Sequence, residues 1–197
     1  MRVISGKFKG LNLSSFEEDH IRPTMDRVKE TWFNIISGNL PNAKCLDLFA
    51  GTGSLGIEAL SRGVDSVLFV EKNPRSIAVL ENNLSKLKMT KKSNQIRILR
   101  KDVLSFVKAY EEEIFDLIFV DPPFTEKMGH DVLEALDKSR LYNSDTVIMI
   151  ETSTRERLDK EYSNLVMIDQ RKFGDILLSF FKKKSATLNN TNDEKET

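Results

Sequence analysis

Residues 45–56 read CLDLFAGTGSLG, and this stretch decides the fold that the sequence predicts. A short apolar run leads into a glycine-rich loop, and the loop leads into a segment with helical spacing. Gly51, Gly53 and Gly56 form the pattern G-x-G-x-x-G, which joins a strand to a helix in nucleotide-binding α/β proteins. Glu71 ends the next apolar run, where an acid accepts hydrogen bonds from ribose hydroxyls. The stretch predicts a nucleoside-cofactor site, with a tight structural turn as the alternative.

The alternation of apolar runs and helical segments continues along the chain. Runs typical of buried parallel strands cover 45–49, 66–70, 96–99, 115–121 and 146–151. Helical spacing covers 54–62, 74–88, 103–112 and 126–138. This alternation predicts a doubly wound α/β sheet. Two further β-rich runs, 166–172 and 176–182, flank a Phe-Gly-Asp turn and predict a closing antiparallel hairpin.

Local signals mark where several of these elements begin and end. Asn73 precedes Pro74, which is the N-cap and first-turn pattern of a helix. Gly63 stands where a glycine would end the first helix of the alternation. Ser153 and Glu156 have the spacing of a capping box and predict a short helix after the fifth strand.

The N-terminal part of the chain, residues 1–40, has a different pattern. Residues 3–13 alternate weakly around two glycines and suggest a small hairpin. Thr24 is expected to cap the next helix, which has four apolar positions at helical spacing. These positions are Val28, Trp32, Ile35 and Ile36. We expect this face to pack on the α/β sheet, so that Trp32 serves packing rather than base stacking.

Composition excludes several classes of protein. Thirty Lys and Arg balance thirty Asp and Glu, so only a local patch could attract a nucleic acid. The single cysteine, Cys45, excludes a disulfide framework and a four-cysteine metal site. His20 and His130 lack metal-ligand spacing, and no apolar run approaches the roughly 18 residues of a membrane span. We expect a cytoplasmic, monomeric protein without a metal ion or a membrane contact.

Two acids indicate which nucleoside cofactor the loop holds. NAD and S-adenosylmethionine both fit the glycine pattern, but Asp47 at the loop entrance would repel a pyrophosphate and attract the cationic amino group of a methionine. Asp102 follows the third strand and could accept a hydrogen bond from the adenine amine, or cap the following helix. We therefore expect S-adenosylmethionine, and we place Phe49 of the same loop among the residues that contact it.

The fourth strand ends in Asp121-Pro122-Pro123-Phe124. Two prolines stop the strand and make a rigid corner at the carboxyl end of the sheet, where open α/β sheets bind ligands. The Asp121 carboxylate and the carbonyls of the corner can accept the N–H groups of an exocyclic amine, and Phe124 can stack on the base. This arrangement would orient the amine for methyl transfer. The alternative is a proline turn with an incidental acid.

These motifs resemble the bacterial RsmD family, a branch of the S-adenosylmethionine-dependent Rossmann-like methyltransferases. The resemblance covers about residues 3–182, and its most specific part is the N-terminal block. It is carried by RPT (22–24), DRVKE (26–30), FN (33–34), LDLFAGTG (46–53), GIEALSR (56–62) and VDPPF (120–124). The departures are Lys29, where arginine is common in the family, and the segment after Ser185, which has no counterpart.

The resemblance implies a fold and an activity. The fold would be a seven-stranded methyltransferase sheet with the last strand antiparallel. The activity would be methylation of N2 of a guanine in small-subunit ribosomal RNA, at guanine 966 in bacterial numbering, on free RNA or on an assembling 30S particle. We expect residues 1–40 to form an extension that is a candidate for RNA binding, 41–184 the methyltransferase domain, and 185–197 a disordered tail.

Basic residues near the N-terminus are the candidates for RNA binding. They are Arg2, Lys7, Lys9, Arg22, Arg27 and Lys29. Arg22 and Arg27 could instead pair internally with Asp26 or Glu30. The basic stretch 86–101 is less suitable, because most of it leads into the third strand at the edge opposite the site, where it would form a solvated face.

Other functions fit parts of the same pattern. A DNA adenine-N6 methyltransferase would use the same corner, but it usually needs a target-recognition insertion for which the chain has little room. A nicotinamide-dependent dehydrogenase would need a substrate domain. A non-catalytic RNA-binding ribosome assembly factor would not need an intact DPPF.

Overall fold

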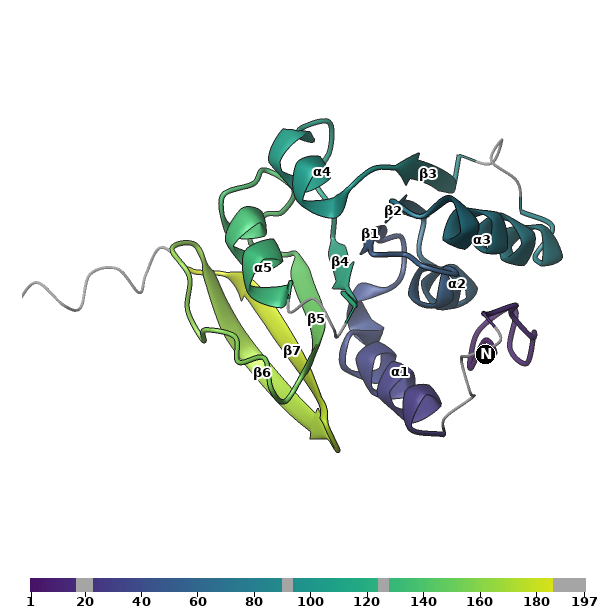
Figure 1. Ribbon diagram of the computed structural model, residues 1–197, viewed down its shortest axis with the longest axis horizontal. Helices are drawn as coiled ribbons and strands as arrows, with labels where there is room; N and C mark the ends of the chain where they lie inside the picture. The colour runs from purple at the N-terminus through teal and green to yellow at the C-terminus, as the bar shows by residue number, and fades with distance from the viewer. Residues whose placement is uncertain (17–22, 90–93, 124–127, 186–197) are drawn as a thin grey trace, which may run out of the picture.

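The computed structural model describes residues 1–16, 23–89, 94–123 and 128–185, and places seven strands in one sheet. The strand order is β3-β2-β1-β4-β5-β7-β6 (Figure 1). The strands are β1 (Lys44–Leu48), β2 (Ser66–Glu71), β3 (Ile96–Arg100), β4 (Leu117–Val120), β5 (Val147–Ser153), β6 (Leu165–Phe173) and β7 (Ile176–Lys183). Neighbouring strands from β3 to β5 are parallel, whereas β7 is antiparallel to both β5 and β6. The predicted doubly wound sheet and its closing hairpin are confirmed.

Helices cover both faces of the sheet. They are α1 (Pro23–Ile35), α2 (Ser54–Ser61), α3 (Pro74–Lys86), α4 (Val103–Ala109) and α5 (Gly129–Asp137), with a short 3₁₀ helix, η1 (Ser37–Asn39). Residues of α1, α2 and α3 share one core with alternate strand positions such as Phe69 and Phe119. Residues of α4 and α5 share the second core with the opposite positions, such as Val70 and Val120. The continuous apolar strands are explained by this burial on both faces.

The N-terminal residues form a hairpin-like loop that is part of the first core. Arg2 and Asn12 form an isolated antiparallel bridge, and Val3 and Leu13 are buried. The loop is fixed to α2 by the carboxylate of Glu58, which accepts hydrogen bonds from the backbone N–H groups of Ile4 and Ser5. This packing explains why Glu58 is fully buried in the middle of a helix.

Two details of α1 correct the predictions. The helix begins at Pro23, so Thr24 lies inside its first turn and is not the N-cap. Ile35 is 40% exposed, whereas Phe33 is fully buried beside Trp32. The helical period allowed either position, and Phe33 is the one that packs in the core, with its ring against that of Phe119 in β4.

The other helix caps lie where the sequence predicted them, with one exception. The Asn73 side chain accepts a hydrogen bond from Arg75 N at the start of α3, and Gly63 has a positive φ just after α2. The helix predicted from Ser153 and Glu156 does not form, because Ser153 ends β5. Glu156 instead accepts a hydrogen bond from the backbone N–H of Gly129 at the start of α5, with an N–O distance of 2.7 Å.

The strand order creates a crevice between β1 and β4. The chain leaves β1 for a helix on one face of the sheet and leaves β4 for a helix on the other face. The two loops therefore separate at the carboxyl ends of these strands, which is where open α/β sheets bind ligands. No helix in the part of the chain that the structure describes is long and apolar enough to cross a membrane.

Candidate active site

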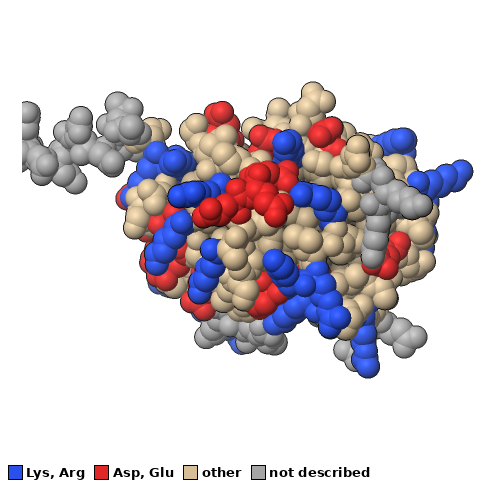
Figure 2. Space-filling view, turned by 90° about the horizontal axis from the view of Figure 1, so that it is seen from above, with Lys and Arg blue, Asp and Glu red and all other residues tan. Residues whose placement is uncertain are grey.

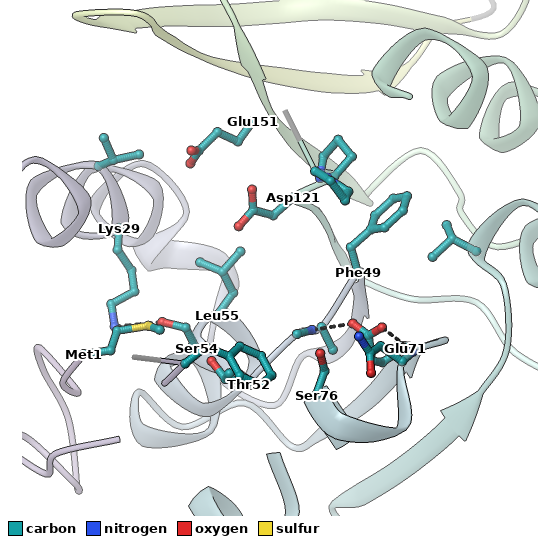
Figure 3. Close-up of a pocket in the computed structure, with 18 of the residues that line it drawn as sticks. Met1, Lys29, Phe49, Thr52, Ser54, Leu55, Glu71, Ser76, Asp121 and Glu151 are labelled. Atoms are coloured by element: carbon teal, nitrogen blue, oxygen red, sulfur yellow. Dashed lines mark hydrogen bonds between the residues drawn. The ribbon is translucent and has the colours of Figure 1, made fainter. Parts of the chain in front are cut away.

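A cavity of about 550 Å³ opens at this crevice, between α1 and the carboxyl ends of the central strands (Figure 3). This volume is within the roughly 300–1,000 Å³ range of small-molecule sites. Its wall combines residues of the glycine loop, of the turn after β2, of the DPPF corner and of α1. The wall residues used below are Trp32, Phe49, Gly51, Glu71, Val103, Asp121 and Glu151.

The glycine loop has the backbone conformation that its sequence predicts. Gly51 and Gly53 have φ angles of 54° and 87°, in the left-handed region that glycine adopts readily. Phe49 has a φ of 61° and lines the cavity. A bulky residue in this region is strained, and such strain is found at functional sites. The loop thus brings backbone and the side chain of Phe49 to the cavity wall.

Glu71 joins the two loops on the β1–β2 side of the cavity. One carboxylate oxygen accepts a hydrogen bond from Gly51 N at 2.8 Å, and the other accepts one from Asn73 N at 2.7 Å. Each oxygen keeps a second lone pair, because an ionised carboxylate offers about four acceptor sites. The group can therefore hold the loop in shape and still accept hydrogen bonds from a ligand.

Asp47 lies beneath the loop rather than in the cavity wall. Its carboxylate accepts a hydrogen bond from Gly56 N at 2.9 Å and is 1% exposed. Burial raises the pKa of Asp47 to about 8, the Gly56 hydrogen bond opposes the rise, and the charges of Asp121 and Glu71 add to it. A direct contact between Asp47 and a cofactor stays a prediction.

The DPPF corner presents Asp121 to the cavity. Its carboxylate points into the open space (Figure 3). It makes no hydrogen bond or ion pair with any residue of the described ranges. The solvent of the cavity reaches it, but the surrounding walls remove enough water to raise its pKa above the usual carboxyl value. Pro122 is buried and fixes the corner, whereas Phe124 lies outside the described residues.

Glu151 is a site residue that the sequence analysis did not single out. It lies near the end of β5 and lines the same cavity as Asp121. Burial raises its pKa, the charge of Asp121 raises it further, and the indole of Trp32 opposes the rise. The sequence did contain a signal, because an acid follows the apolar run of β5 just as Asp121 follows that of β4.

Asp102 has the capping role that was one of its two interpretations. Its carboxylate accepts a hydrogen bond from Ser105 N at 3.1 Å at the start of α4. The next residue, Val103, lines the cavity. The cap therefore lies next to the cavity wall, and the predicted contact of Asp102 with adenine stays a prediction.

The basic residues of the N-terminal part divide into two groups. Lys29 is buried and bonds to Arg2 O at 2.7 Å and Ser54 Oγ at 3.3 Å, with Glu58 Oε2 at 3.4 Å. Burial lowers the pKa of Lys29 while Glu58 opposes this. These partners occupy the three donors of the ammonium group, so Lys29 is a structural cation and the prediction that it binds RNA is corrected.

The remaining candidates are on the surface or undescribed. Arg2 pairs with Asp26 at 3.1 Å, and 63% of its side chain is exposed. Lys7, Lys9 and Arg27 are exposed, and Arg22 lies outside the described residues. In the basic stretch 86–101, Lys86 bonds to Ser14 Oγ and Arg97 pairs with Glu113, so part of it has a structural role. Figure 2 shows blue and red side chains mixed over one face of the molecule.

These residues fit an adenosine-type cofactor with a charged amino-acid tail. The cavity has a carboxylate with free lone pairs at Glu71, a backbone kept close by glycines, and apolar contacts from Phe49 and Val103. Within the described ranges, no three His, Cys, Asp or Glu side chains come together as metal ligands.

The fold and the cavity together define a Rossmann-like methyltransferase. The solved structure of yhhF from Escherichia coli matches with a TM-score of 0.80 and 26% identity, over 94% of this chain and 98% of that chain. SMU.776, solved in complex with S-adenosylhomocysteine, matches with a TM-score of 0.66 over 82% of this chain and 50% of that chain. Its 15% identity shows the fold alone.

Sequence similarity assigns the family. A family model described as "Conserved hypothetical protein 95" matches residues 1–182, and the chain belongs to this family, the S-adenosylmethionine-dependent RsmD methyltransferases. "Ribosomal RNA small subunit methyltransferase D" of Haemophilus influenzae is 36% identical over 153 residues, which are 77% of this chain and 78% of that protein.

Proposed function

We propose that this protein transfers a methyl group from S-adenosylmethionine to the exocyclic N2 of a guanine in small-subunit ribosomal RNA. The relatives named as small-subunit rRNA methyltransferases support the RNA, and the family resemblance supports guanine 966 in bacterial numbering. The observation that carries the proposal is the presence of the Asp121 corner and the glycine loop in one cavity. A methyl donor and an exocyclic amine need to meet in this way for direct transfer.

The β1–β2 side of the cavity would hold the cofactor. Glu71 would accept hydrogen bonds from the ribose hydroxyls, while Gly51 and Gly53 keep the loop close to the ligand. Phe49 would pack against the adenosine, and Asp102 would accept from the adenine amine. Asp47 would support the methionine end of the cofactor from beneath the loop, where the positive charge of the methionine amino group would favour loss of the carboxyl proton. When bound, S-adenosylmethionine supplies a methyl group attached to a positively charged sulfur. Once the methyl group has been transferred, this sulfur is a neutral thioether.

The corner would hold the base. Asp121 and the carbonyls of the two prolines accept the N–H groups of the amine and so direct its lone pair toward the cofactor. No strong base is required before attack, because the amine becomes acidic as the new N–C bond forms and its proton then passes to the Asp121 carboxylate that it already bonds. The base has to be unstacked to reach the cavity, and Phe124 would stack on it. Lys7, Lys9 and Arg27 would contact RNA phosphates, with Arg2 released from Asp26.

The proposal is tested by methyl transfer to ribosomal particles. Small subunits from a strain lacking the gene are incubated with tritiated S-adenosylmethionine and either wild-type protein or Asp121→Ala. We expect the rate of the variant to fall by about two to four orders of magnitude, because the substitution removes both the orientation of the amine and the charge that complements it. Asp65→Asn is the matched control, since Asp65 is an exposed acid at the opposite edge of the sheet.

Mass mapping of the product nucleotide decides the substrate. Label at N2 of guanine 966 agrees with the proposal. Label in adenine or in DNA contradicts the guanine assignment, and no label with any particle favours a non-catalytic assembly factor. Equal rates for Asp121→Ala and wild type would show that the DPPF corner is not the reacting site.

A further inference from the structure

We propose that Glu151 reads the target base: its carboxyl group accepts the N1–H of the guanine while Asp121 takes the adjacent N2 amine. The inference rests on the proposed function and adds a residue that determines base specificity. It follows from the placement of Glu151 beside Asp121, from the lack of an ion pair between Glu151 and any described residue, and from the indole of Trp32 beside it.

The sheet register brings the two carboxyl groups together. Val120 of β4 pairs with Ile150 of β5 in a parallel ladder, so Asp121 and Glu151 are the next residues on neighbouring strands. Both line the cavity, and in Figure 3 both carboxyl groups extend into the same space between α1 and the strand ends. A base held by Asp121 would therefore present its neighbouring edge to Glu151.

The fold does not use these two carboxyl groups. Neither forms a hydrogen bond of normal length or an ion pair with a residue that the structure describes, although the Lys29 ammonium lines the same cavity and is committed to other partners. Two like charges side by side in a confined site disfavour each other's ionisation. An arrangement that costs stability and serves no internal contact is typical of a ligand site.

Trp32 supplies the second observation. It is fully buried, lines the cavity, and its indole N–H has no hydrogen-bond partner. Buried donors without a partner are rare, and each calls for an explanation. This donor acts on Glu151, whose charged form it favours. A small movement of the carboxyl group on base binding would let the indole hold one oxygen while the other faces the base.

Guanine matches this pair of acceptors and adenine does not. The Watson–Crick edge of guanine presents N1–H and N2–H₂ as adjacent donors. Adenine presents its amine beside N1, and N1 is an acceptor. In the same corner, N1 would face an oxygen of Glu151 that is also an acceptor. The guanine N1–H can bond to a carboxylate or to the carbonyl oxygen of a carboxylic acid, but only the carboxylate rejects an acceptor at N1, because a carboxylic acid can donate its O–H to it. In its carboxylate form, which the bound N1–H and the indole of Trp32 both favour, Glu151 would thus select guanine over adenine in the same corner.

The test replaces the target guanine with 2-aminopurine in semi-synthetic rRNA that is assembled into small subunits. This base keeps the reacting N2 amine but has an acceptor at N1. For the wild type we expect kcat/KM for guanine to exceed that for 2-aminopurine by about 10- to 100-fold. Glu151→Gln should reduce this ratio about 10-fold or more, because its amide can donate to N1 of 2-aminopurine. Glu151→Ala should also lower the ratio.

The outcomes separate this inference from the proposed function. If Glu151→Gln and Glu151→Ala lower the rates on both bases equally, the ratio stays constant and the inference is overturned, while wild-type methylation of guanine still stands. If the wild type places no methyl group on guanine N2, the proposed function fails and the inference fails with it. Asp65→Asn, assayed in parallel, should keep the wild-type ratio and rate.

Discussion

The two sides of the cavity use their acids differently. On the β1–β2 side, Asp47 and Glu71 accept hydrogen bonds from backbone N–H groups and so fix the glycine loop. On the β4–β5 side, Asp121 and Glu151 contact no described hydrogen-bond donor at normal distance. The first side is shaped by internal contacts, and the second side leaves its polar groups for a ligand. Substitutions should therefore affect folding as well as cofactor binding on the first side, and activity without loss of stability on the second.

The largest effect on packing is expected at Gly56. A Cβ there would meet the ring of Phe69, which is fully buried, and would lie 2.9 Å from Asp47 Oδ2. Because neither neighbour can move freely, we expect Gly56→Ala to lower the free energy of unfolding by about 1–3 kcal/mol in urea denaturation. Gly38→Ala is the control, since no atom lies within 4 Å of its added Cβ. Equal stability of the two variants would contradict a tightly packed loop.

The next effect is a pH dependence at Asp47. Burial raises its carboxyl pKa from 3.8 to about 8, so the folded protein binds the proton more tightly and loses stability as pH rises between these values. Asp47→Asn removes this titration, and its amide oxygen can still accept from Gly56. Relative to wild type, the variant should gain up to about 1.4 kcal/mol per pH unit over this window. Denaturation curves at about pH 5, 6, 7 and 8 measure the difference, and a constant difference would argue against a buried proton.

At Asp121 we expect a smaller change in the free energy of unfolding, and this change is an increase. Asp121→Asn removes a like charge beside Glu151 without breaking any hydrogen bond to a described residue. The solvent in the cavity screens this repulsion, so the variant should be more stable than wild type by about 0.5–1 kcal/mol at about pH 8. Its methyl transfer should fall by less than that of Asp121→Ala, because the amide keeps one oxygen acceptor for the amine but loses the negative charge. A destabilised variant would mean that Asp121 serves the fold, which would remove the contrast between the two sides.

The smallest effect is expected at the surface. Lys7 is exposed above the ring of Phe8, and Lys9 is exposed beside it in sequence. Replacing both with alanine should leave stability unchanged and weaken binding to small subunits only a few-fold. The slope of log K against log salt should become shallower by about one for each RNA phosphate that these lysines neutralise. An unchanged slope would exclude these lysines from the RNA interface.

Local patterns were sufficient to predict most of the fold. Continuous apolar strands alternating with helices indicated the sheet, and the caps at Asn73 and Gly63 were placed correctly. Errors arose where tertiary contacts decide between equivalent local choices. Phe33 rather than Ile35 faces the core of α1, and Glu156 caps α5 rather than a helix of its own.

The candidate site was also predicted only in part, because tertiary contacts decide which other residues reach the cavity. Glycines and a DPPF sequence can be recognised locally, so Gly51, Glu71 and Asp121 were placed in one cavity. Burial of Lys29 depends on Glu58, which belongs to another helix. The role of Glu151 depends on the register between β4 and β5 and on the unpartnered indole of Trp32. Neither relation is visible in a linear sequence.

A crystal structure with S-adenosylhomocysteine tests the central claim most directly, because the claim is that one cavity joins a cofactor side and a base side. We expect the ribose hydroxyls within hydrogen-bond distance of Glu71 and the sulfur atom facing the carboxyl group of Asp121. Adenosylhomocysteine bound outside this cavity, or with its sulfur turned away from Asp121, would contradict it.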